Sequence, residues 1–428
     1  MHPSLRMRSH AIAITLQCAL FCFLMGAAAL FMLGPDDAVA AQIDLRPSLM
    51  VGEEYNDNIF LTPTGKVEDF ITTIAPAFTL VHNTSFWTWN VDFVYYYRDY
   101  ARGTVTRDQT YNALVAEHTN LVENLFFLDV SDLYQRVSTN VAQAYIAQQS
   151  LFLNQTDQNI FTVNPYVNLI SGPSHTVSVG YQYVNTWYKD PLAYDTVDNI
   201  GYIVMGTPLS SNLTITGGVR YTRDLNSLNG YFITEIYTGG VYTYSPRSSF
   251  ICYLGEDWLR FAGYPTIQHL YWDLGIIQHY STMTLMIETK TGYVHDPYLV
   301  LRRVDQLEIT LTKEQSARTS LSGVLGWYQY LNAAQEHLET NEYVVTARLR
   351  HIITPRWTLS GELSNTIYQD FVAGTDTYIY HIMAELEHSL LTDLMLSASW
   401  IYDYTYSPDV YSDNSRVNRV QVALTKRF

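Results

Sequence analysis

The feature that constrains this chain most is an alternation of apolar and polar residues that recurs from residue 43 to residue 428. In the clearest segment, residues 87–98, the odd positions hold Trp, Trp, Val, Phe, Tyr and Tyr, and the even positions hold Thr, Asn, Asp, Val, Tyr and Arg. Successive side chains of a β-strand point to opposite faces, so this period of two gives each strand an apolar and a more polar face. Segments 176–183, 213–222 and 359–364 repeat the pattern. The sequence therefore predicts an all-β fold.

The composition favours a membrane barrel over a soluble β-sandwich, the alternative that would also alternate. Tyr supplies 35 of 428 residues, aromatic residues reach 14%, and charged residues make up only 15%. A transmembrane barrel needs this mixture, because its outer face is apolar, its inner face is polar and aromatic girdles lie at both interfaces. No apolar run after residue 41 approaches the roughly 20 residues of a membrane helix. We therefore expect a transmembrane antiparallel up-and-down barrel over residues 41–428.

The first 40 residues have the features of an export signal. Arg6 and Arg8 are basic, residues 11–33 are apolar, and Ala38-Val39-Ala40 is a small-residue cleavage site. The predicted mature chain begins near Ala41, and an uncleaved membrane anchor is the alternative. A signal followed by a barrel predicts the outer membrane of a Gram-negative bacterium.

The turns between the alternating segments differ in length in a regular way. Short turns occur at 83–85, 171–173, 245–247, 354–356 and 392–393, and longer polar segments lie at 55–67, 99–107, 138–155, 188–196, 224–230, 333–340 and 406–415. Bacterial barrels have short periplasmic turns and long outer loops, so both termini should be periplasmic and the strand number even. We predict about 20 strands, with 18 as the alternative, because the register of residues 196–280 cannot be read.

Charged residues on the polar face should line the lumen. The predicted pore-lining acids are Asp92, Asp129, Glu288, Glu308, Glu362, Glu385 and Glu387, and the predicted bases are Arg98, Arg220, Lys290, Arg348, Arg350, Arg419 and Arg427. Seven acids against seven bases predict a nearly neutral wall, with the net charge of −16 placed mainly in loops. Two interpretations stay open: the charges select solutes, or they form salt bridges that satisfy one another. Tyr96 and Tyr328 also face the lumen by parity, where their rings could stack on sugars.

The most distinctive stretch is Gly52-Glu53-Glu54-Tyr55-Asn56-Asp57-Asn58-Ile59-Phe60-Leu61, followed by Asp69-Phe70-Ile71-Thr72-Thr73-Ile74-Ala75-Pro76. It resembles the opening strands of the β-barrel porin 2 family, including members associated with exopolysaccharide and PEP-CTERM gene clusters. The family motif falls on Glu54, Tyr55, Asn56, Asp57, Asn58, Ile59, Asp69 and Phe70. The resemblance implies an outer-membrane barrel that serves polysaccharide secretion, and it brings no catalytic residues. Asn56, Asp57 and Asn58 could otherwise be a polar loop start or a calcium site.

The chain ends in Phe428 on an alternating strand, which resembles the C-terminal signal that barrel-assembly machinery reads. The expected partners are therefore this machinery, outer-membrane lipid and lipopolysaccharide, and components of polysaccharide export. The acidic balance disfavours nucleic acid, since a binder would show a basic patch.

The expected function is a porin-like channel for polar solutes, because a barrel of about 20 strands is too wide for side chains alone to fill. No plug domain is expected, since alternation begins directly after the predicted cleavage site. The alternative is a structural or interaction barrel whose lumen or loops bind a partner, such as a haem protein. We expect no enzyme, no cofactor and no metal site, because the sequence has no hydrolase, zinc-protease, P-loop or haem-attachment motif.

Overall fold

The computed structural model describes residues 42–106, 108–139, 153–172, 174–225, 230–298, 301–410 and 414–428. The predicted export signal, residues 1–40, lies outside this part of the chain. Over the described residues the chain forms the predicted 20 strands. They are β1 (Gln42–Asn56), β2 (Asp69–Asn83), β3 (Trp87–Tyr100), β4 (Asp108–Val122), β5 (Phe126–Ser138), β6 (Gln155–Ser171), β7 (Thr176–Tyr188), β8 (Thr196–Ser210), β9 (Leu213–Asp224), β10 (Tyr231–Ser245), β11 (Ser248–Phe261), β12 (Ile267–His279), β13 (Met283–His295), β14 (Leu301–Ser316), β15 (Thr319–Asn332), β16 (Leu338–Thr354), β17 (Trp357–Asp370), β18 (Thr375–Ser389), β19 (Leu394–Tyr406) and β20 (Ser415–Arg427).

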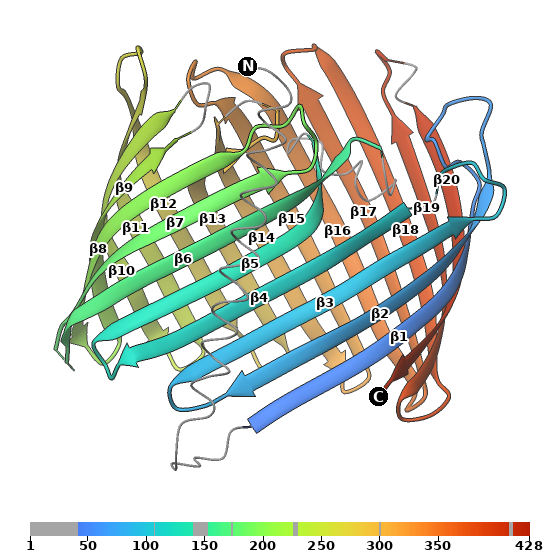
Figure 1. The fold of residues 1–428 in the computed structure, drawn as a ribbon, viewed down its shortest axis with the longest axis horizontal. Coiled ribbons are helices and arrows are strands. Elements are labelled where there is room, and N and C mark those ends of the chain that lie inside the picture. The colour runs from blue at the N-terminus through green and yellow to red at the C-terminus, as the bar shows by residue number, and fades with distance from the viewer. Residues whose placement is uncertain are drawn as a thin grey trace. The chain divides into compact units, whose positions relative to one another are not determined.

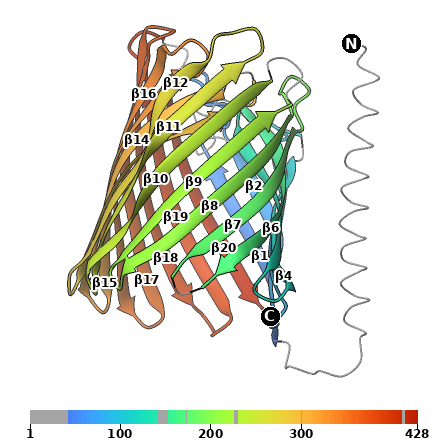
Figure 2. The same ribbon diagram turned by 90° about the vertical axis from the view of Figure 1, so that its left-hand side faces the viewer.

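The strands close into one antiparallel up-and-down barrel (Figures 1 and 2). Each strand pairs with its neighbour in sequence, and β1 pairs with β20 from Ser48–Arg427 to Asn56–Arg419. Closure leaves no open sheet edge, which is the condition for strands to cross a bilayer. The fold class and the preferred strand number are confirmed.

The connections alternate in length as the sequence predicted. Turns of two to four residues join β2–β3, β4–β5 and the following even–odd pairs, whereas the connections after odd strands have up to sixteen residues. β1 begins and β20 ends at the end of the barrel that carries the short turns (Figure 1). Since short turns are periplasmic in bacterial barrels, the long loops are extracellular.

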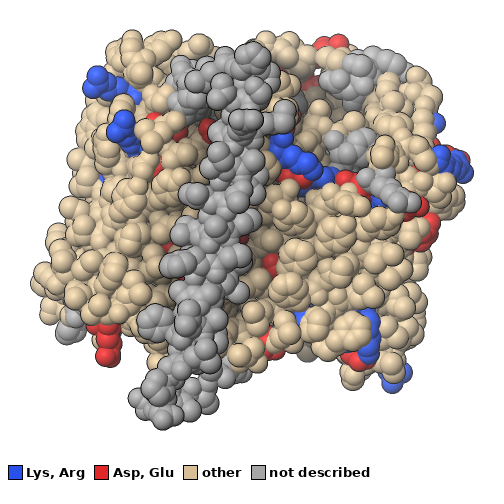
Figure 3. Space-filling view, viewed as in Figure 1, with Lys and Arg blue, Asp and Glu red and all other residues tan. Residues whose placement is uncertain are grey.

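The outer face is apolar between its two ends. In the view of Figure 3, charged side chains gather toward the rims and the band between them is mostly uncharged. Val345 and Leu363 on this face are 51% and 58% exposed. Such residues would be costly in water but suit a hydrocarbon bilayer, so this is an outer-membrane barrel. No helix in the described part of the chain has the length and apolarity of a membrane-crossing helix.

Candidate functional site: the lumen wall

The register identifies the lumen face of every strand. Arg348 pairs with Glu362, and these polar residues alternate with the outward-facing Leu349 and Leu363. The same parity passes from strand to strand through the ladders, because directly paired residues point to the same face. The same parity assigns the two faces in residues 196–280, where the sequence alone did not show the register. Arg220 pairs with Glu235 on the lumen face there, and Val219 pairs with Ile236 on the outer face.

The register places all of the predicted pore-lining charges on the lumen face. Two predicted pairs form ion pairs: Lys290 with Glu288 at 2.5 Å and Arg348 with Glu362 at 2.8 Å. Arg98 and Arg419 instead pair with Asp108 at 2.9 Å and Asp403 at 2.6 Å. Mutual neutralisation therefore accounts for part of the set, and a role of these residues in permeation stays a prediction.

The expectation of a nearly neutral wall is wrong. Acidic residues that the sequence analysis did not assign also face the lumen: Glu54, Glu235, Asp257, Asp273, Glu342 and Asp403. Arg46 and Arg303 add bases on the described strands: Arg46 is paired with Asp44, and Arg303 is paired with Asp305 and lies 2.7 Å from the lumen-facing His269. Glu235, Asp257 and Asp273 make no ion pair with a basic side chain in the described chain, so the wall has an acidic excess. The signal was missed because Glu235, Asp257 and Asp273 lie in the segment that is apolar on both faces.

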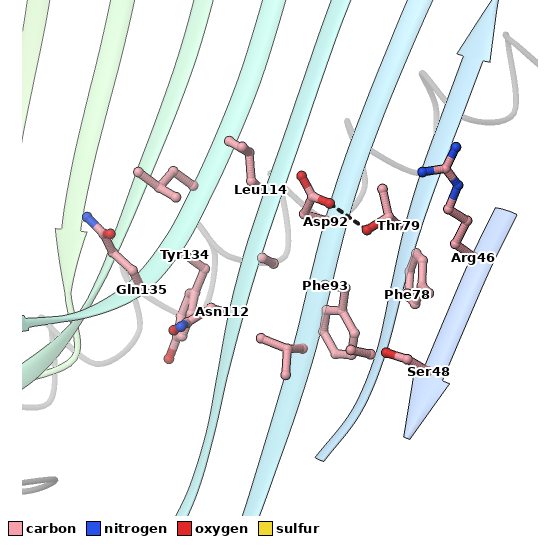
Figure 4. A pocket seen from close by; sticks show the side chains of 14 residues that line it. Arg46, Ser48, Phe78, Thr79, Asp92, Phe93, Asn112, Leu114, Tyr134 and Gln135 are labelled. Atoms are coloured by element: carbon pink, nitrogen blue, oxygen red, sulfur yellow. Dashed lines mark hydrogen bonds between the residues drawn. The ribbon is translucent and has the colours of Figure 1, made fainter. Parts of the chain in front are cut away.

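The lumen face of β1–β7, here called the polar wall, is lined mostly by uncharged polar side chains. A hollow of about 340 Å³ lies over β1–β5 (Figure 4). Apolar side chains such as Phe93 and Leu114 make up most of its lining, and Asp92 there accepts a hydrogen bond of 2.8 Å from the Thr79 hydroxyl. A second hollow of about 400 Å³ lies over β3–β7, and its polar lining includes Asn90, Ser131 and Gln182. Hydroxyls and amides can both donate and accept, so this wall suits neutral, hydrogen-bonding solutes.

The lumen face of β8–β17, here called the tyrosine wall, has a different lining. It carries the tyrosines Tyr202, Tyr237, Tyr253, Tyr271, Tyr328, Tyr330 and Tyr368. Carboxylates lie among them: the Tyr328 hydroxyl donates to Glu308 at 2.9 Å, and Tyr330 and Tyr368 donate to the two oxygens of Glu342 at 3.1 and 2.8 Å. Tyr328 was predicted to face the lumen, and the rest of this set was not identified.

The extracellular end of the β13–β14 hairpin leaves the wall and folds into the lumen. The ladder between β12 and β13 stops at Asp273–Lys290, whereas β13 and β14 stay paired up to His295–Leu301. Beyond Lys290 the hairpin turns its formerly outward side chains against the lumen face of β10 and β11. There Leu301 belongs to one apolar cluster with residues of those strands. The cluster comprises Tyr231, Ile233, Leu259, Phe261, Leu301 and Ala333, with Tyr293 and Ala334 packed against it.

Polar contacts anchor this infolded hairpin to strands that are distant in the barrel. His295 lies 2.8 Å from the Tyr231 hydroxyl and 3.5 Å from a carboxylate oxygen of Asp198 on β8. The amide of Tyr194, in the β7–β8 loop, donates to the carbonyl of Pro297 at 2.8 Å. In addition, the Tyr298 hydroxyl donates to Asp190 in that loop.

The Tyr298 hydroxyl keeps its proton at physiological pH. Burial and the hydrogen bond to the Asp190 carboxylate raise the pKa of Tyr298 to about 12. The hydroxyl therefore remains a donor to Asp190. The hairpin, which reaches from β13 to β8, narrows the extracellular mouth above the tyrosine wall.

The family-motif residues lock the seam between the first and last strands. Asp57 accepts bonds from the Asn418 amide at 2.7 Å and from its side chain at 2.8 Å, while the Asp57 amide donates to the Asn418 carbonyl at 3.1 Å. Asn58 is fully buried, and its side-chain amide donates to the carbonyls of Thr62 and Arg416. Asn56 accepts the Asn58 amide at 2.9 Å. These side chains are satisfied by the protein itself, which favours a structural role over the calcium site.

The second half of the motif holds the neighbouring loops. Asp69 is fully buried and accepts backbone bonds from Phe70 and Arg102 and a hydroxyl bond from Thr104. Glu68 accepts bonds from Tyr55 at 2.6 Å and Arg102 at 2.5 Å. These two donors hold the pKa of Glu68 below its usual value. The Tyr55 ring lies 5.2 Å from that of Phe70, and Glu54 faces the lumen.

The loop between β1 and β2 also covers part of the lumen face. Ile59 is buried against Ile71 and Tyr100, with Phe60 and Val105 packed around them. At the opposite end of the seam, the Phe428 amide donates to the Pro47 carbonyl at 2.9 Å, so the terminal residue continues the β1–β20 pairing. Recognition of Phe428 by assembly machinery stays a prediction.

Two histidine–aspartate pairs lie on the lumen face, His118–Asp129 at 2.6 Å and His381–Asp403 at 2.7 Å. Ser364 is directly paired with His381, but its hydroxyl is bonded to Thr346 at 3.0 Å. The Ser364 hydroxyl is therefore engaged by Thr346 rather than by His381, the contact that a nucleophile and its base would make. The described residues also contain no group of three or more His, Cys, Asp or Glu that could hold a metal ion.

The fold is similar to those of solved outer-membrane transporters and receptors. The FrpB iron transporter of Neisseria meningitidis aligns with a TM-score of 0.52 at 7% identity over 90% of this chain and 83% of that one. The ferric enterobactin receptor PfeA of Pseudomonas aeruginosa aligns with a TM-score of 0.50 at 10% identity over 90% and 80%. At this identity the likeness shows the fold alone. No family model and no curated protein matches the sequence.

Proposed function

We propose that the barrel is an outer-membrane channel for polar solutes that serves the export of polysaccharide. The observation that carries the proposal is the lining of the lumen by two continuous polar walls, one of hydroxyls and amides and one of tyrosines and carboxylates. Barrels with fewer strands already hold an aqueous channel. The resemblance of residues 52–76 to the β-barrel porin 2 family supports polysaccharide as the solute.

A barrel that houses or binds a partner is the second candidate, and one observation favours it. The infolded hairpin narrows the extracellular mouth, so the lumen of the isolated protein could be closed until a partner moves the hairpin. The two candidates differ in what the purified protein does alone.

Planar-bilayer recording of the mature protein separates them. A channel should give stable conductance steps at high salt, and liposomes that contain it should swell in solutions of small sugars. A control with heat-denatured protein should give neither signal. If the folded barrel, identified by its heat-dependent shift in gel mobility, gives no conductance and no swelling, the channel proposal fails and the partner-binding barrel takes its place.

A further inference from the structure

We propose that the tyrosine wall is a binding track for a polysaccharide that carries amino groups. The inference deepens the proposed function and rests on it, because it names the chemical class of the solute. Three features of β8–β17 carry it: rings that cover glycines of the wall, the closeness of these rings to one another, and an excess of carboxylates over basic side chains between them.

Three rings lie over glycines of the wall. A Cβ placed on Gly180 would lie 2.2 Å from Cζ of Tyr202, and one on Gly218 would lie 2.5 Å from Cζ of Tyr237. Gly180 and Gly218 are the direct cross-strand partners of these tyrosines. In the same way, a Cβ on Gly326 would lie 2.7 Å from Tyr328. Each ring therefore covers backbone of the wall on the lumen side, where it is available for contact with the C–H face of a sugar ring.

The rings on β10–β12 form one cluster in which the planes of Tyr237 and Tyr253 are 82° apart and those of Tyr237 and Tyr271 are 44° apart. The centroid of Tyr237 lies 6.1 Å from that of Tyr253 and 5.8 Å from that of Tyr271. The ladder continues around the wall through Asp273–Lys290, Lys290–Gln306 and Gln306–Tyr328 to Glu342. Stacking surfaces are thus followed by hydrogen-bonding groups along one line of the barrel, a layout that suits a polymer better than a single small molecule.

The carboxylates of the tyrosine wall indicate which charge a bound polymer should carry. Glu235 is paired directly with Asp257, and Glu288 directly with Glu308. Like charges directly opposite one another destabilise a sheet, so the fold itself gains nothing from these pairings. Glu235 and Asp273 are half-buried beside Tyr237 and Tyr253. Arg220 and Lys290 are their direct cross-strand neighbours, but among the described residues neither base forms an ion pair within 4 Å of these two carboxylates. An ammonium group on a sugar would supply the missing positive charge, whereas a uronic-acid polymer would be repelled.

Block of single-channel current by defined oligosaccharides tests the inference. The probes are hexamers of glucosamine, of N-acetylglucosamine and of galacturonic acid, added to the protein in planar bilayers. We expect the cationic glucosamine hexamer to block at the lowest concentration, the neutral hexamer at a higher one, and the anionic hexamer at the highest. Equal or stronger block by the anionic hexamer would overturn the inference and leave the channel intact, whereas absence of conductance would instead overturn the proposed function.

Matched variants test whether the tyrosine rings are responsible for block by the glucosamine hexamer. Tyr237→Leu with Tyr271→Leu should weaken block by the glucosamine hexamer about tenfold, because the stacking faces are lost. Tyr221→Leu is the control, since Tyr221 lies on the outer face of β9 and is 46% exposed. Gly218→Ala should lift the Tyr237 ring and weaken block, and Gly201→Ala, which has no atom near its Cβ site, should not. All variants are checked for folding by heat-dependent gel mobility, and block unchanged in folded Tyr237→Leu/Tyr271→Leu protein contradicts the track.

Discussion

The polar wall and the tyrosine wall belong to one barrel, and in both every second residue along a strand faces the lumen. The two walls nevertheless differ in chemistry. Over β1–β7 hydroxyls and amides predominate and two hollows open, one of them lined mostly by apolar side chains, whereas over β8–β17 tyrosine rings cover glycines among carboxylates. The infolded hairpin packs against β10 and β11 of the tyrosine wall and is anchored to the β7–β8 loop, where the two walls meet. The difference indicates that the pore is asymmetric: one side offers general hydrogen bonding, and the other offers stacking and negative charge beneath a constriction.

Removal of the infolded hairpin should have the largest effect on conductance. Replacing residues 293–303 with an Asn-Gly turn would join the cross-strand neighbours Gly292 and Val304 directly. We expect single-channel conductance to rise by about twofold or more, since a lumenal constriction limits ion flow. Replacing residues 371–374, the β17–β18 loop, with the same turn is the control. Unchanged conductance in the folded hairpin variant would show that the mouth is not narrowed on this side.

The contact between Asp57 and Asn418 at the β1–β20 pairing, here called the seam lock, allows a test of whether this edge of the polar wall keeps the barrel closed. Asp57→Ala removes the acceptor of two bonds from Asn418, and loss of hydrogen bonds to a charged group should lower the free energy of unfolding by about 1.5–3 kcal/mol. The midpoint of urea unfolding, followed by gel mobility, measures it. Asp44→Ala removes a lumenal carboxylate paired only with its exposed neighbour Arg46 and should change little. Equal effects of the two variants would contradict a lock.

Charge removal should separate the two walls by ion selectivity. Glu235→Gln, Asp257→Asn and Asp273→Asn together should shift the reversal potential in a salt gradient away from cation preference, because these carboxylates form no ion pair within 4 Å among the described residues, although Arg220 and Lys290 lie opposite two of them. Asp92→Asn with Asp129→Asn on the polar wall should shift it less, since Asp92 is bonded to Thr79 and Asp129 to His118. A larger shift from the polar-wall variant would reverse the assignment of the acidic side.

Loss of one anchor should loosen the hairpin without unfolding the barrel. Tyr298→Phe removes the hydroxyl that donates to Asp190 and keeps the ring. A single hydrogen bond contributes about 1 kcal/mol, so closed–open fluctuations of the current should become severalfold more frequent. The urea midpoint should stay that of the unmodified protein. Tyr264→Phe, in the exposed β11–β12 loop, serves as the control; current noise identical to it would show that Tyr298 does not hold the hairpin.

The smallest expected effect is a pH dependence of the loops beside the polar wall. The pKa of Glu68 is lowered by bonds from Tyr55 and Arg102, so its contribution is present above the ordinary value near 4.5 and is lost as pH falls through the lowered value. Protease cleavage of loops 57–68 and 101–107 should therefore increase in that acidic range. Glu68→Gln should remove this step, and its persistence in the variant would assign the step to another group.

The sequence was sufficient for the barrel and insufficient for the difference between its walls. Strand number, turn lengths and the lumen face of charges such as Arg348 and Glu362 follow from alternation, because a period of two fixes which side chains share a face. Glu235, Asp257 and Asp273 were missed since aromatic residues occupy both faces of those strands. Register there is set by pairing with neighbours, which a single strand does not encode.

The infolded hairpin could not be predicted either. Thr291, Tyr293 and His295 continue the alternation of β13 without interruption, yet they leave the outer face and pack inside the lumen. The change is in the pairing of β13: its ladder with β12 ends at Asp273–Lys290, and beyond that point β13 is paired with β14. That choice depends on contacts with β8, β10 and β11, which lie far away in sequence. In contrast, the importance of the family motif was visible, although its role as a seam lock required the partner Asn418.

The seam lock joins two residues that lie 361 positions apart in the sequence, Asp57 directly after β1 and Asn418 in β20. The network therefore cannot form until β1 and β20 have come together. A prematurely terminated or clipped polypeptide could pair most of its strands but would keep two unpaired edges. The Asp57–Asn418 contact can thus form only in a polypeptide that contains both β1 and β20, so it distinguishes the closed barrel from a fragment.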